Sequence, residues 1–259
     1  MTGLAGKRYW LIGASSGIGR QLALCLAREG AAVVASARSE QALLSLVEEM
    51  QPVRTRHGGH AAVALDVTVG DATIRAFRNA GTIDGVIYCA GAYEPMSAKY
   101  PDLDALEQIV EVNLTGALRV LAASVPEFCR RQSGHVLLIG SLAGSRGLPN
   151  AWGYGATKAA LTHLAECLVC DLQGSGVKIQ ICSPGFVESR LTAKNSFRMP
   201  FIMTSQDAAV RIVHGMKRNR HEIVFPFIMA TAFRLLSALP RRVYFLLLAY
   251  LSWLRRRDP

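Results

Sequence analysis

Two polar side chains four residues apart are spaced for proton transfer. Tyr154 and Lys158 are separated by Gly-Ala-Thr. On a helix this spacing places both residues on one face, so the ammonium of Lys158 can lie beside the phenol of Tyr154. A nearby cation favours the phenolate, which would lower the pKa of a tyrosine below its ordinary value of about 10. The same spacing also occurs in helices where both side chains face solvent, so the pair needs a second, independent feature.

A glycine-rich turn near the N-terminus is that second feature. It occupies residues 13–19, after an apolar run at 8–12 and before a helical pattern that ends at Gly30. Strand, glycine turn and helix in this order are typical of a dinucleotide-binding fold, in which glycines let the backbone approach a pyrophosphate. The turn residues expected to contact the cofactor are Gly13, Ser15, Ser16, Gly17, Ile18 and Gly19.

The choice of dinucleotide depends on Arg38. This residue ends the second apolar run, 32–37, and stands nineteen residues after Gly19. An acidic residue at this place ordinarily binds the adenosine ribose hydroxyls, whereas an arginine can bind a 2′-phosphate. Ser39 and Ser15 can assist it. The alternative is a solvent-facing arginine at the start of the next helix. Since no acid stands there, the sequence predicts NADP(H).

The chain resembles the short-chain dehydrogenase/reductase family from about Lys7 to Phe225. Further motifs follow in the family's order. They are Leu65-Asp66-Val67, Cys89-Ala90-Gly91, Val112-Asn113-Leu114-Thr115-Gly116, Gly140-Ser141 and Pro184-Gly185-Phe186-Val187. The resemblance implies a Rossmann-type, doubly wound parallel α/β sheet in a three-layer, single-domain fold.

The resemblance also implies roles for individual residues. Hydride would pass between a nicotinamide and a carbonyl or carbinol carbon, with Tyr154 as proton donor or base. Lys158 would lower the pKa of Tyr154 and bind the nicotinamide ribose, and Ser141 would hydrogen-bond the reacting oxygen. Asn113 would hold a water that passes protons from Lys158 to solvent. The further cofactor contacts implied are Asp66, Val67, Ala90, Gly91, Asn113, Tyr154, Lys158, Pro184, Gly185, Val187 and Ser189.

Each polar residue could instead have a purely structural role, as a strand-ending turn residue, a buried amide or a surface charge. Two positions also depart from the family pattern. Ile12 replaces a threonine and Cys89 an asparagine, and in the family these polar groups tie the glycine turn to the neighbouring strand. We expect packing to replace that tie. Ser189 replaces another threonine but keeps a hydroxyl for the nicotinamide carboxamide.

Composition supports one sizeable domain with a tail. The chain has 259 residues, 51% of them apolar, and its alternating patterns favour a parallel sheet. Strands are expected near 8–13, 32–37, 61–66, 84–89, 135–140, 178–183 and 222–225. The predicted units are a catalytic domain, 1–225, and a hydrophobic, arginine-rich helical tail, 226–259. Two long helices, about 106–132 and 154–174, carry more apolar positions than one buried face needs, which predicts a homodimer or homotetramer.

The six cysteines lack the dense spacing of a secreted disulfide framework, and no signal peptide is recognisable. We therefore expect a cytoplasmic protein with reduced thiols. Cys167 and Cys170 have a metal-like spacing without a second pair, so a core role is expected and no metal. The net charge is +10, but no lysine- or arginine-rich recognition helix is present, which argues against nucleic acid.

Half of the excess charge lies in the tail, where six arginines and one aspartate follow Pro226. Met229 to Leu239 predicts an amphipathic helix, with Thr231, Arg234 and Ser237 on its polar stripe. Val243 to Leu254 is uncharged and too short to span a bilayer. Its aromatic residues Tyr244, Tyr250 and Trp253 and the arginines at both ends suit peripheral contact with the inner face of an anionic membrane. Packing on the protein's own substrate cleft or on another subunit is the equal alternative.

The leading functional prediction is an NADP(H)-dependent oxidoreductase for a hydrophobic, lipid-like ketone or alcohol. One alternative is a 3-oxoacyl thioester reductase in lipid synthesis, and the other is a non-catalytic NADP(H)-binding sensor or scaffold. The loops near 144–152 and 186–203 would decide the substrate.

Overall fold

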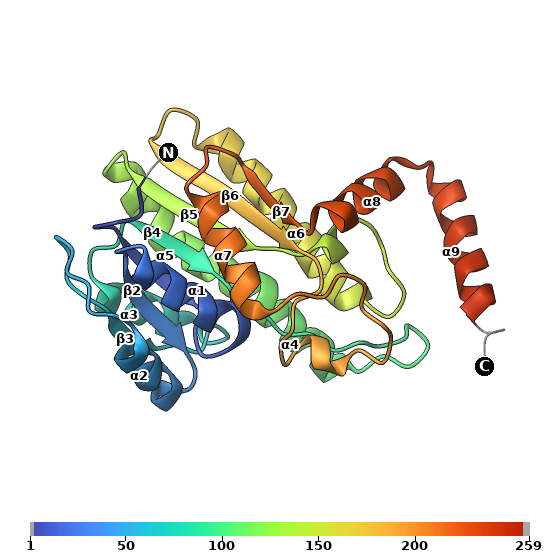
Figure 1. The fold of residues 1–259 in the computed structure, drawn as a ribbon, viewed down its shortest axis with the longest axis horizontal. Coiled ribbons are helices and arrows are strands. Elements are labelled where there is room, and N and C mark those ends of the chain that lie inside the picture. The colour runs from blue at the N-terminus through green and yellow to red at the C-terminus, as the bar shows by residue number, and fades with distance from the viewer. Residues whose placement is uncertain (1–2, 256–259) are drawn as a thin grey trace.

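Short apolar runs form the strands of one parallel sheet. The computed structural model describes residues 3–255 and orders the strands β3-β2-β1-β4-β5-β6-β7 (Figure 1). They are β1 (Arg8–Ile12), β2 (Ala32–Ala37), β3 (Ala61–Ala64), β4 (Gly85–Tyr88), β5 (Gly134–Ile139), β6 (Val177–Pro184) and β7 (Glu222–Phe225). Every bound lies within about two residues of its predicted position, the usual spread at element ends.

Helices cover both faces of the sheet. Buried residues of α1 (Gly17–Arg28), α2 (Glu40–Glu49) and α7 (Ser205–Met216) pack in one apolar cluster. Those of α3 (Gly70–Ala80), α5 (Gly116–Arg130) and α6 (Trp152–Asp171) pack in a second. The predicted Rossmann-type, three-layer α/β architecture is therefore confirmed.

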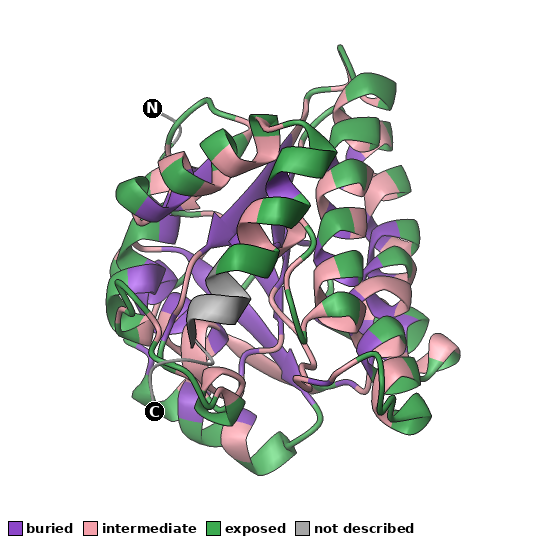
Figure 2. Ribbon diagram, turned by 90° about the vertical axis from the view of Figure 1, so that its right-hand side faces the viewer, coloured by how far each residue is buried: buried purple, intermediate pink, exposed green. Residues whose placement is uncertain are grey.

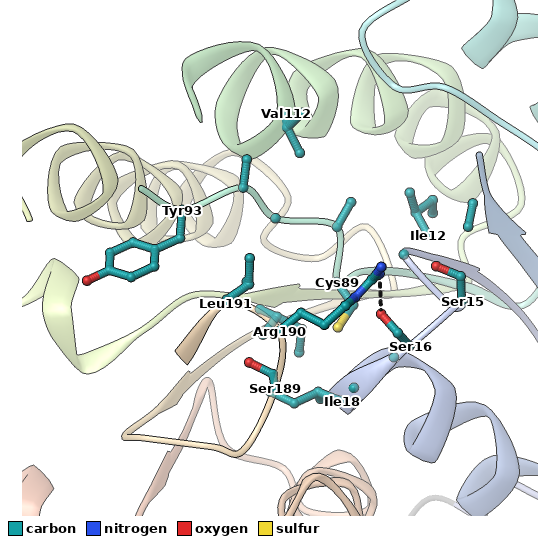
Figure 3. Close-up of a pocket in the computed structure, with 18 of the residues that line it drawn as sticks. Ile12, Ser15, Ser16, Ile18, Cys89, Tyr93, Val112, Ser189, Arg190 and Leu191 are labelled. Atoms are coloured by element: carbon teal, nitrogen blue, oxygen red, sulfur yellow. Dashed lines mark hydrogen bonds between the residues drawn. The ribbon is translucent and has the colours of Figure 1, made fainter. Parts of the chain in front are cut away.

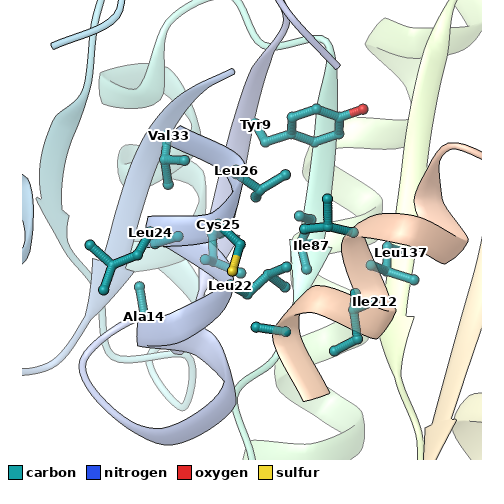
Figure 4. Close-up of a cluster of buried hydrophobic side chains, with 14 of the residues drawn as sticks. Tyr9, Ala14, Leu22, Leu24, Cys25, Leu26, Val33, Ile87, Leu137 and Ile212 are labelled. Atoms are coloured by element: carbon teal, nitrogen blue, oxygen red, sulfur yellow. The ribbon is translucent and has the colours of Figure 1, made fainter. Parts of the chain in front are cut away.

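Strand β1 shows why the strands read as continuous apolar runs. Successive side chains of a strand point to opposite faces. Tyr9 and Leu11 accordingly join the cluster with α1 and α7, whereas Trp10 and Ile12 join the cluster on the other face. Figure 4 shows the first cluster, with Leu22 and Leu26 of α1 facing Ile87, Leu137 and Ile212. Because both faces are covered, the positions from Tyr9 to Ile12 favour apolar residues, and Figure 2 shows the buried strands enclosed by outer helices.

The order of the strands creates a crevice where β1 and β4 lie side by side. The chain moves from β1 through β2 to β3 in one direction, and β4 then pairs with the other edge of β1. In open α/β sheets, ligands bind outside the carboxyl ends of the strands at this reversal. The glycine turn follows β1 and residues 89–91 follow β4, so both motifs lie at this edge.

The long helical segment 103–130 joins α4 (Leu103–Val110), a π-helical turn (Glu111–Thr115) and α5. By length and composition this segment could cross a membrane. Core helices of globular proteins pass the same test, and here α4 packs against α6 while α5 packs against α3. We therefore describe the segment as part of the helical layer.

Two helices follow the last strand. α8 (Phe227–Ala238) and α9 (Arg241–Arg255) lie at one side of the molecule, and α9 projects beyond it (Figure 1). α8 packs Met229 and Ala230 against Leu142, the residue after Ser141. The helix predicted at 229–239 is thus present, but its expected polar residue Ser237 is half-buried, and its Oγ donates to the carbonyl of Ser145.

α9 is attached to the loop that follows Ser141. Tyr244 is buried, and its hydroxyl donates to the carbonyl of Gly147 at 2.6 Å. Arg146 lies over the Tyr244 ring at 4.8 Å and donates to the carbonyls of Ser237 and Leu239. Tyr244 therefore faces the protein and not the solvent side that the membrane interpretation requires. Trp253, also part of that interpretation, has a side chain outside the described part of the chain.

Candidate active site

A cleft of about 940 Å³ at the carboxyl ends of the strands brings the predicted site residues together. All of the predicted site residues except Asn113 line this cleft, and they come from seven separate parts of the sequence. The lining includes Gly13, Ser15, Ser16, Gly17, Ile18, Gly19, Arg38, Ser39, Asp66, Val67, Ala90, Gly91, Ser141, Tyr154, Lys158, Pro184, Gly185, Val187 and Ser189. Figure 3 shows one part of this cleft, with Ser15, Ser16 and Ile18 on one side and Tyr93 on the other.

The glycine turn has the close contacts that its sequence predicts. Gly13 adopts φ +89°, and a Cβ there would lie 2.5 Å from the backbone nitrogen of Ala90. A Cβ on Gly19 would collide with the carbonyl of Gly13. Larger residues would therefore push the turn away from the end of β4 and from the first turn of α1. This backbone path is the one that a dinucleotide-binding turn requires.

Backbone hydrogen bonds to β2 and apolar packing both hold the glycine turn. The backbone N–H groups of Gly13 and Ala14 both donate to the carbonyl of Ser36, at 2.8 and 3.1 Å. The side chain of Ser36 accepts from the indole of Trp10 at 2.9 Å. Ile12 is buried in the second apolar cluster and Cys89 packs against the first, as expected, and the hydrogen bonds to Ser36 add to this packing.

The end of β1 and the start of α1 suit an anion. Ser16 is the N-cap of α1, but its side chain accepts no capping hydrogen bond from the helix, and the first residues of α1 line the cleft. Arg38 and Ser39 lie further along the cleft. Ser39 caps α2 by accepting from Ala42 N. These residues fit a dinucleotide phosphate at α1 and a second phosphate near Arg38.

Asp66 lies on the same side as Arg38. Burial raises the pKa of its carboxyl, but hydrogen bonds from the N–H and hydroxyl of Thr68 and the charge of Arg38 outweigh burial and lower the pKa overall. Asp66 therefore stays ionised at neutral pH and orders the loop that follows β3.

Tyr154, Lys158 and Ser141 meet because Gly144 allows a close approach. A Cβ on Gly144 would lie 2.7 Å from the carbonyl carbon of Lys158, so only glycine lets the loop after β5 contact α6 here. Tyr154 and Lys158 share one face of α6, as predicted, and Ser141 hydrogen-bonds Tyr154. The Oγ of Ser141 also accepts from Ala143 N at 3.1 Å, which fixes its direction.

The pKa of Tyr154 differs from the prediction. Burial raises it to about 12, although the hydrogen bond with Ser141 acts in the opposite direction. Lys158 does not offset this, because its Nζ donates to the carbonyl of Ile139 at 2.8 Å and lies 5.5 Å from the centre of the Tyr154 ring. Burial lowers the pKa of Lys158 itself to about 8. In the protein without cofactor, Tyr154 is therefore a neutral phenol.

Asn113 lies behind the cleft wall. Its Nδ2 donates to the carbonyl of Ala92 and to the hydroxyl of Thr157, both at 3.0 Å, and its Oδ1 accepts from Ala92 N at 2.7 Å. The π-helical turn that contains Asn113 is fully linked to α6 and to the loop after β4. These bonds fix the position of that loop, and the predicted water relay stays a prediction.

Tyr93 and Arg190 are among the cleft residues that sequence reasoning missed. Tyr93 packs edge-on against Tyr154, with ring centres 4.9 Å apart, and its hydroxyl donates to Asn195 Oδ1 at 2.7 Å. Arg190 donates to the hydroxyl of Ser16 at 2.8 Å. Tyr93 stands two residues after the motif at 89–91 and Arg190 three residues after the motif at 184–187, so position alone was the available signal.

Cys167 and Cys170 are exposed on α6, so the predicted core role is wrong. Both lie on the side of the helix away from Leu161 and Ala165, which pack on the sheet. Within residues 3–255, no group of three histidine, cysteine, aspartate or glutamate residues is placed to hold a metal ion.

Comparisons with known proteins agree with this geometry. A family model for short chain dehydrogenase matches residues 7–199. An uncharacterized oxidoreductase of Myxococcus xanthus (strain DK1622) is 39% identical over 236 residues, which cover 90% of this chain and 92% of the relative. An uncharacterized oxidoreductase of Staphylococcus epidermidis is 31% identical over 216 residues, covering 81% and 90%.

Solved structures share the fold. A short chain dehydrogenase from Burkholderia cenocepacia J2315 in complex with NADP has a TM-score of 0.81 at 20% identity and covers 95% of this chain and 99% of its own. A short-chain dehydrogenase from Sphingobium yanoikuyae in complex with NADPH has a TM-score of 0.77 at 23% identity, covering 91% and 97%. With the family model matching most of its length, this chain belongs to the short chain dehydrogenase family.

Proposed function

We propose that the protein is an NADP(H)-dependent reductase of hydrophobic carbonyl compounds. The observation that carries this proposal is the position of the Tyr154 phenol, hydrogen-bonded to Ser141 in the wall of the same cleft as the glycine turn. Apolar side chains of Ile109, Val112 and Leu191 line the cleft as well. A carbonyl compound whose oxygen is held by Ser141 and Tyr154 would contact these apolar side chains with the rest of its structure.

The protonation state of Tyr154 in the protein without cofactor is the one that reduction requires. A bound nicotinamide supplies the hydride, and the protein must then protonate the oxygen that becomes negative. A phenol whose pKa is raised to about 12 holds its proton at neutral pH and can donate it. The hydroxyl of Ser141 keeps that oxygen in line with the phenol. Lys158, on the same face of α6, would bind the nicotinamide ribose, the role that the family resemblance implies.

The preference for NADP(H) rests on Arg38. Its side chain is exposed at the end of β2 and lines the cleft next to Ser39. The neighbours from Burkholderia cenocepacia and Sphingobium yanoikuyae are complexes with NADP and NADPH, which supports this preference. A 3-ketoacyl-(acyl-carrier-protein) reductase from Brucella melitensis is complexed with NADH.

A turnover assay with hydrophobic ketones and a 3-oxoacyl thioester, each with NADPH or NADH, tests the proposal. No NADPH consumption with any of them would favour a sensor or scaffold.

For the C-terminal helices we propose peripheral contact with an anionic membrane, on the inner face in a cytoplasmic protein. Large apolar side chains of both helices are exposed, among them Phe227, Leu235, Phe245 and Leu246, between 61% and 77%. Arg241 and Arg242, at the start of α9, are exposed beside them. Exposed apolar groups next to arginines match the interface of a bilayer with negative headgroups.

Liposome sedimentation tests the membrane proposal without removing α8, which packs on the domain. The double variant Phe245→Glu/Leu246→Glu should lose binding to anionic vesicles at low salt. The control is Ile74→Glu, which places a carboxylate at an apolar residue of similar exposure on α3. Equal vesicle binding by both variants, or none by the unmodified protein, would support packing of α9 on another subunit.

We also propose a homodimer or homotetramer formed through α4, α5 and α6. Trp152, Val110 and Leu118 on these helices are 43–44% exposed, although they are large and apolar. An apolar groove of about 320 Å³ between α4 and α6 is lined by Leu106 and Trp152. The exposed Cys167 and Cys170 lie on the same helix α6. Pairing of these helices between two copies would cover this surface.

A further inference from the structure

Arg190 joins two distant parts of the cleft. Its loop follows β6, and its Nη2 donates to Ser16 Oγ at 2.8 Å, although the two residues are 174 positions apart in the sequence. Figure 3 shows the guanidinium extending from the loop across to the glycine turn. Ser16 is the N-cap of α1, so Arg190 lies at the positive end of the helix that faces the cleft. A cation at that end has no favourable charge interaction with the helix, which suggests that an anion completes the arrangement.

Of the other three cations that line the cleft, Lys194 and Lys158 have protein partners, whereas Arg38 is the residue proposed above for the 2′-phosphate. Lys194 pairs with Glu94 at 2.5 Å, and Lys158 donates to the carbonyl of Ile139. Arg38 lies at the adenosine end of the site. Among the side chains that the structure describes, no carboxylate forms an ion pair with Arg190. Its one side-chain partner among the described residues is the neutral hydroxyl of Ser16. A guanidinium can bind a phosphate through two parallel, charge-assisted hydrogen bonds, which are stronger than this single bond.

We propose that Arg190 is a phosphate-binding residue of the dinucleotide site, whose guanidinium closes over the pyrophosphate. This inference rests on the proposed binding of NADP(H). The pyrophosphate carries two negative charges and lies at the N-terminus of the first helix in folds of this type. Arg190 reaches that N-terminus from the opposite side of the cleft. Backbone N–H groups of α1 and the guanidinium would thus bind the pyrophosphate from two sides.

The same contact would order the wall of the substrate site. Ser189 precedes Arg190, and Asn195, on the same loop, accepts the hydrogen bond from Tyr93. Tyr93 in turn packs against Tyr154. When Arg190 binds the pyrophosphate, the loop is held at its start by the cofactor and near Asn195 by Tyr93. Cofactor binding would therefore fix the apolar wall before the carbonyl compound binds.

Fluorescence titration of the full-length protein with NADPH and with NADH tests the inference without any substrate. Arg190→Leu should weaken both cofactors by the same factor, roughly tenfold, because both contain the pyrophosphate. Arg190→Lys keeps the positive charge but lacks the paired N–H donors of the guanidinium, so it should recover part of the lost affinity. The matched control is Arg198→Leu, which removes an exposed arginine of the same loop that does not line the cleft. Arg38→Leu should weaken NADPH but not NADH.

Each result has one meaning. Equal affinities for Arg190→Leu and Arg198→Leu would overturn the inference, and so would a loss confined to NADPH, which would assign Arg190 to the 2′-phosphate. Salt provides a second measurement: at high ionic strength the difference between wild type and Arg190→Leu should shrink, since screening weakens charge interactions. If the wild type binds neither cofactor, the proposed function itself fails, which is a different result from an unaltered Arg190→Leu variant.

Discussion

Replacing Lys158 with methionine should stabilise the protein while abolishing its activity. Lys158 is 4% exposed, and burial lowers the pKa of its ammonium from 10.5 to about 8. A difference of this size corresponds to about 3 kcal/mol of unfavourable free energy for holding the charged form inside the fold. Methionine has a similar length, carries no charge and suits an apolar site. The hydrogen bond from Lys158 to the carbonyl of Ile139 would be lost, at a cost of about 1 kcal/mol.

The net expectation is that Lys158→Met raises the free energy of unfolding by roughly 1 to 3 kcal/mol at pH 7, without cofactor. The advantage should shrink as pH rises. Between pH 8 and 10.5 the unfolded chain keeps a proton that folded Lys158 has lost, so the wild type gains stability in that window. Above it, Lys158 is neutral in both states, and its burial cost has disappeared.

Urea denaturation at pH 7, 8.5 and 9.5 measures this difference. Lys99→Met is the control, since Lys99 is exposed and should change stability little. A Lys158→Met variant less stable than wild type at pH 7, or one whose advantage stays constant with pH, would refute the argument that burial of the ammonium is costly.

The remaining predictions concern the cofactor, the proton donor and assembly. Tyr154→Phe should bind NADPH with nearly unchanged affinity but turn over at least about 100-fold more slowly, and near-normal turnover would exclude Tyr154 as the acid. Ala37→Asp with Arg38→Leu should shift the preference toward NADH, measured as the ratio of the two dissociation constants; equal binding of NADH and NADPH by the wild type would contradict the role of Arg38. Trp152→Glu should shift a dimer or tetramer toward monomer in sedimentation velocity, and a wild type that is monomeric at micromolar concentration would contradict the proposed assembly.

The sequence predicted the strands well because their burial on both faces leaves a continuous apolar signal. Residues of β1 from Tyr9 to Ile12 are at most 3% exposed, and no alternation is needed to recognise the strand. The glycine turn was equally readable, since Gly13 adopts a positive φ and packs against Ala90. Local patterns of this kind report what the backbone requires at that position.

Long-range contacts explain what the sequence could not predict. The high pKa of Tyr154 depends on burial by residues from other elements and on the direction of the Lys158 ammonium toward Ile139. The hydrogen bonds from the N–H groups of Gly13 and Ala14 to the carbonyl of Ser36 depend on the pairing of β1 with β2. The contact between Arg190 and Ser16 joins residues 174 positions apart. None of these contacts can be recognised from the spacing of its residues in the sequence.

The apolar tail shows the same limit. Its first helix was predicted from its periodicity and its second as an uncharged segment of a helical tail, and both helices are present. Which side of α9 faces the protein was not predictable, because nearly every position between Val243 and Tyr250 is apolar. The structure distinguishes them: Tyr244 is buried, whereas Leu246 is 72% exposed.

Transfer of deuterium from NADPH labelled at the reactive nicotinamide carbon tests the central claim most directly. The protein is incubated with labelled NADPH and hydrophobic ketones, and the alcohols are analysed by mass spectrometry. We predict one deuterium on the carbinol carbon of the product with wild type and none above background with Tyr154→Phe. Deuterated alcohol formed equally well by Tyr154→Phe would contradict the mechanism, and no deuterated alcohol from a wild type that binds NADPH would contradict the assignment as a carbonyl reductase.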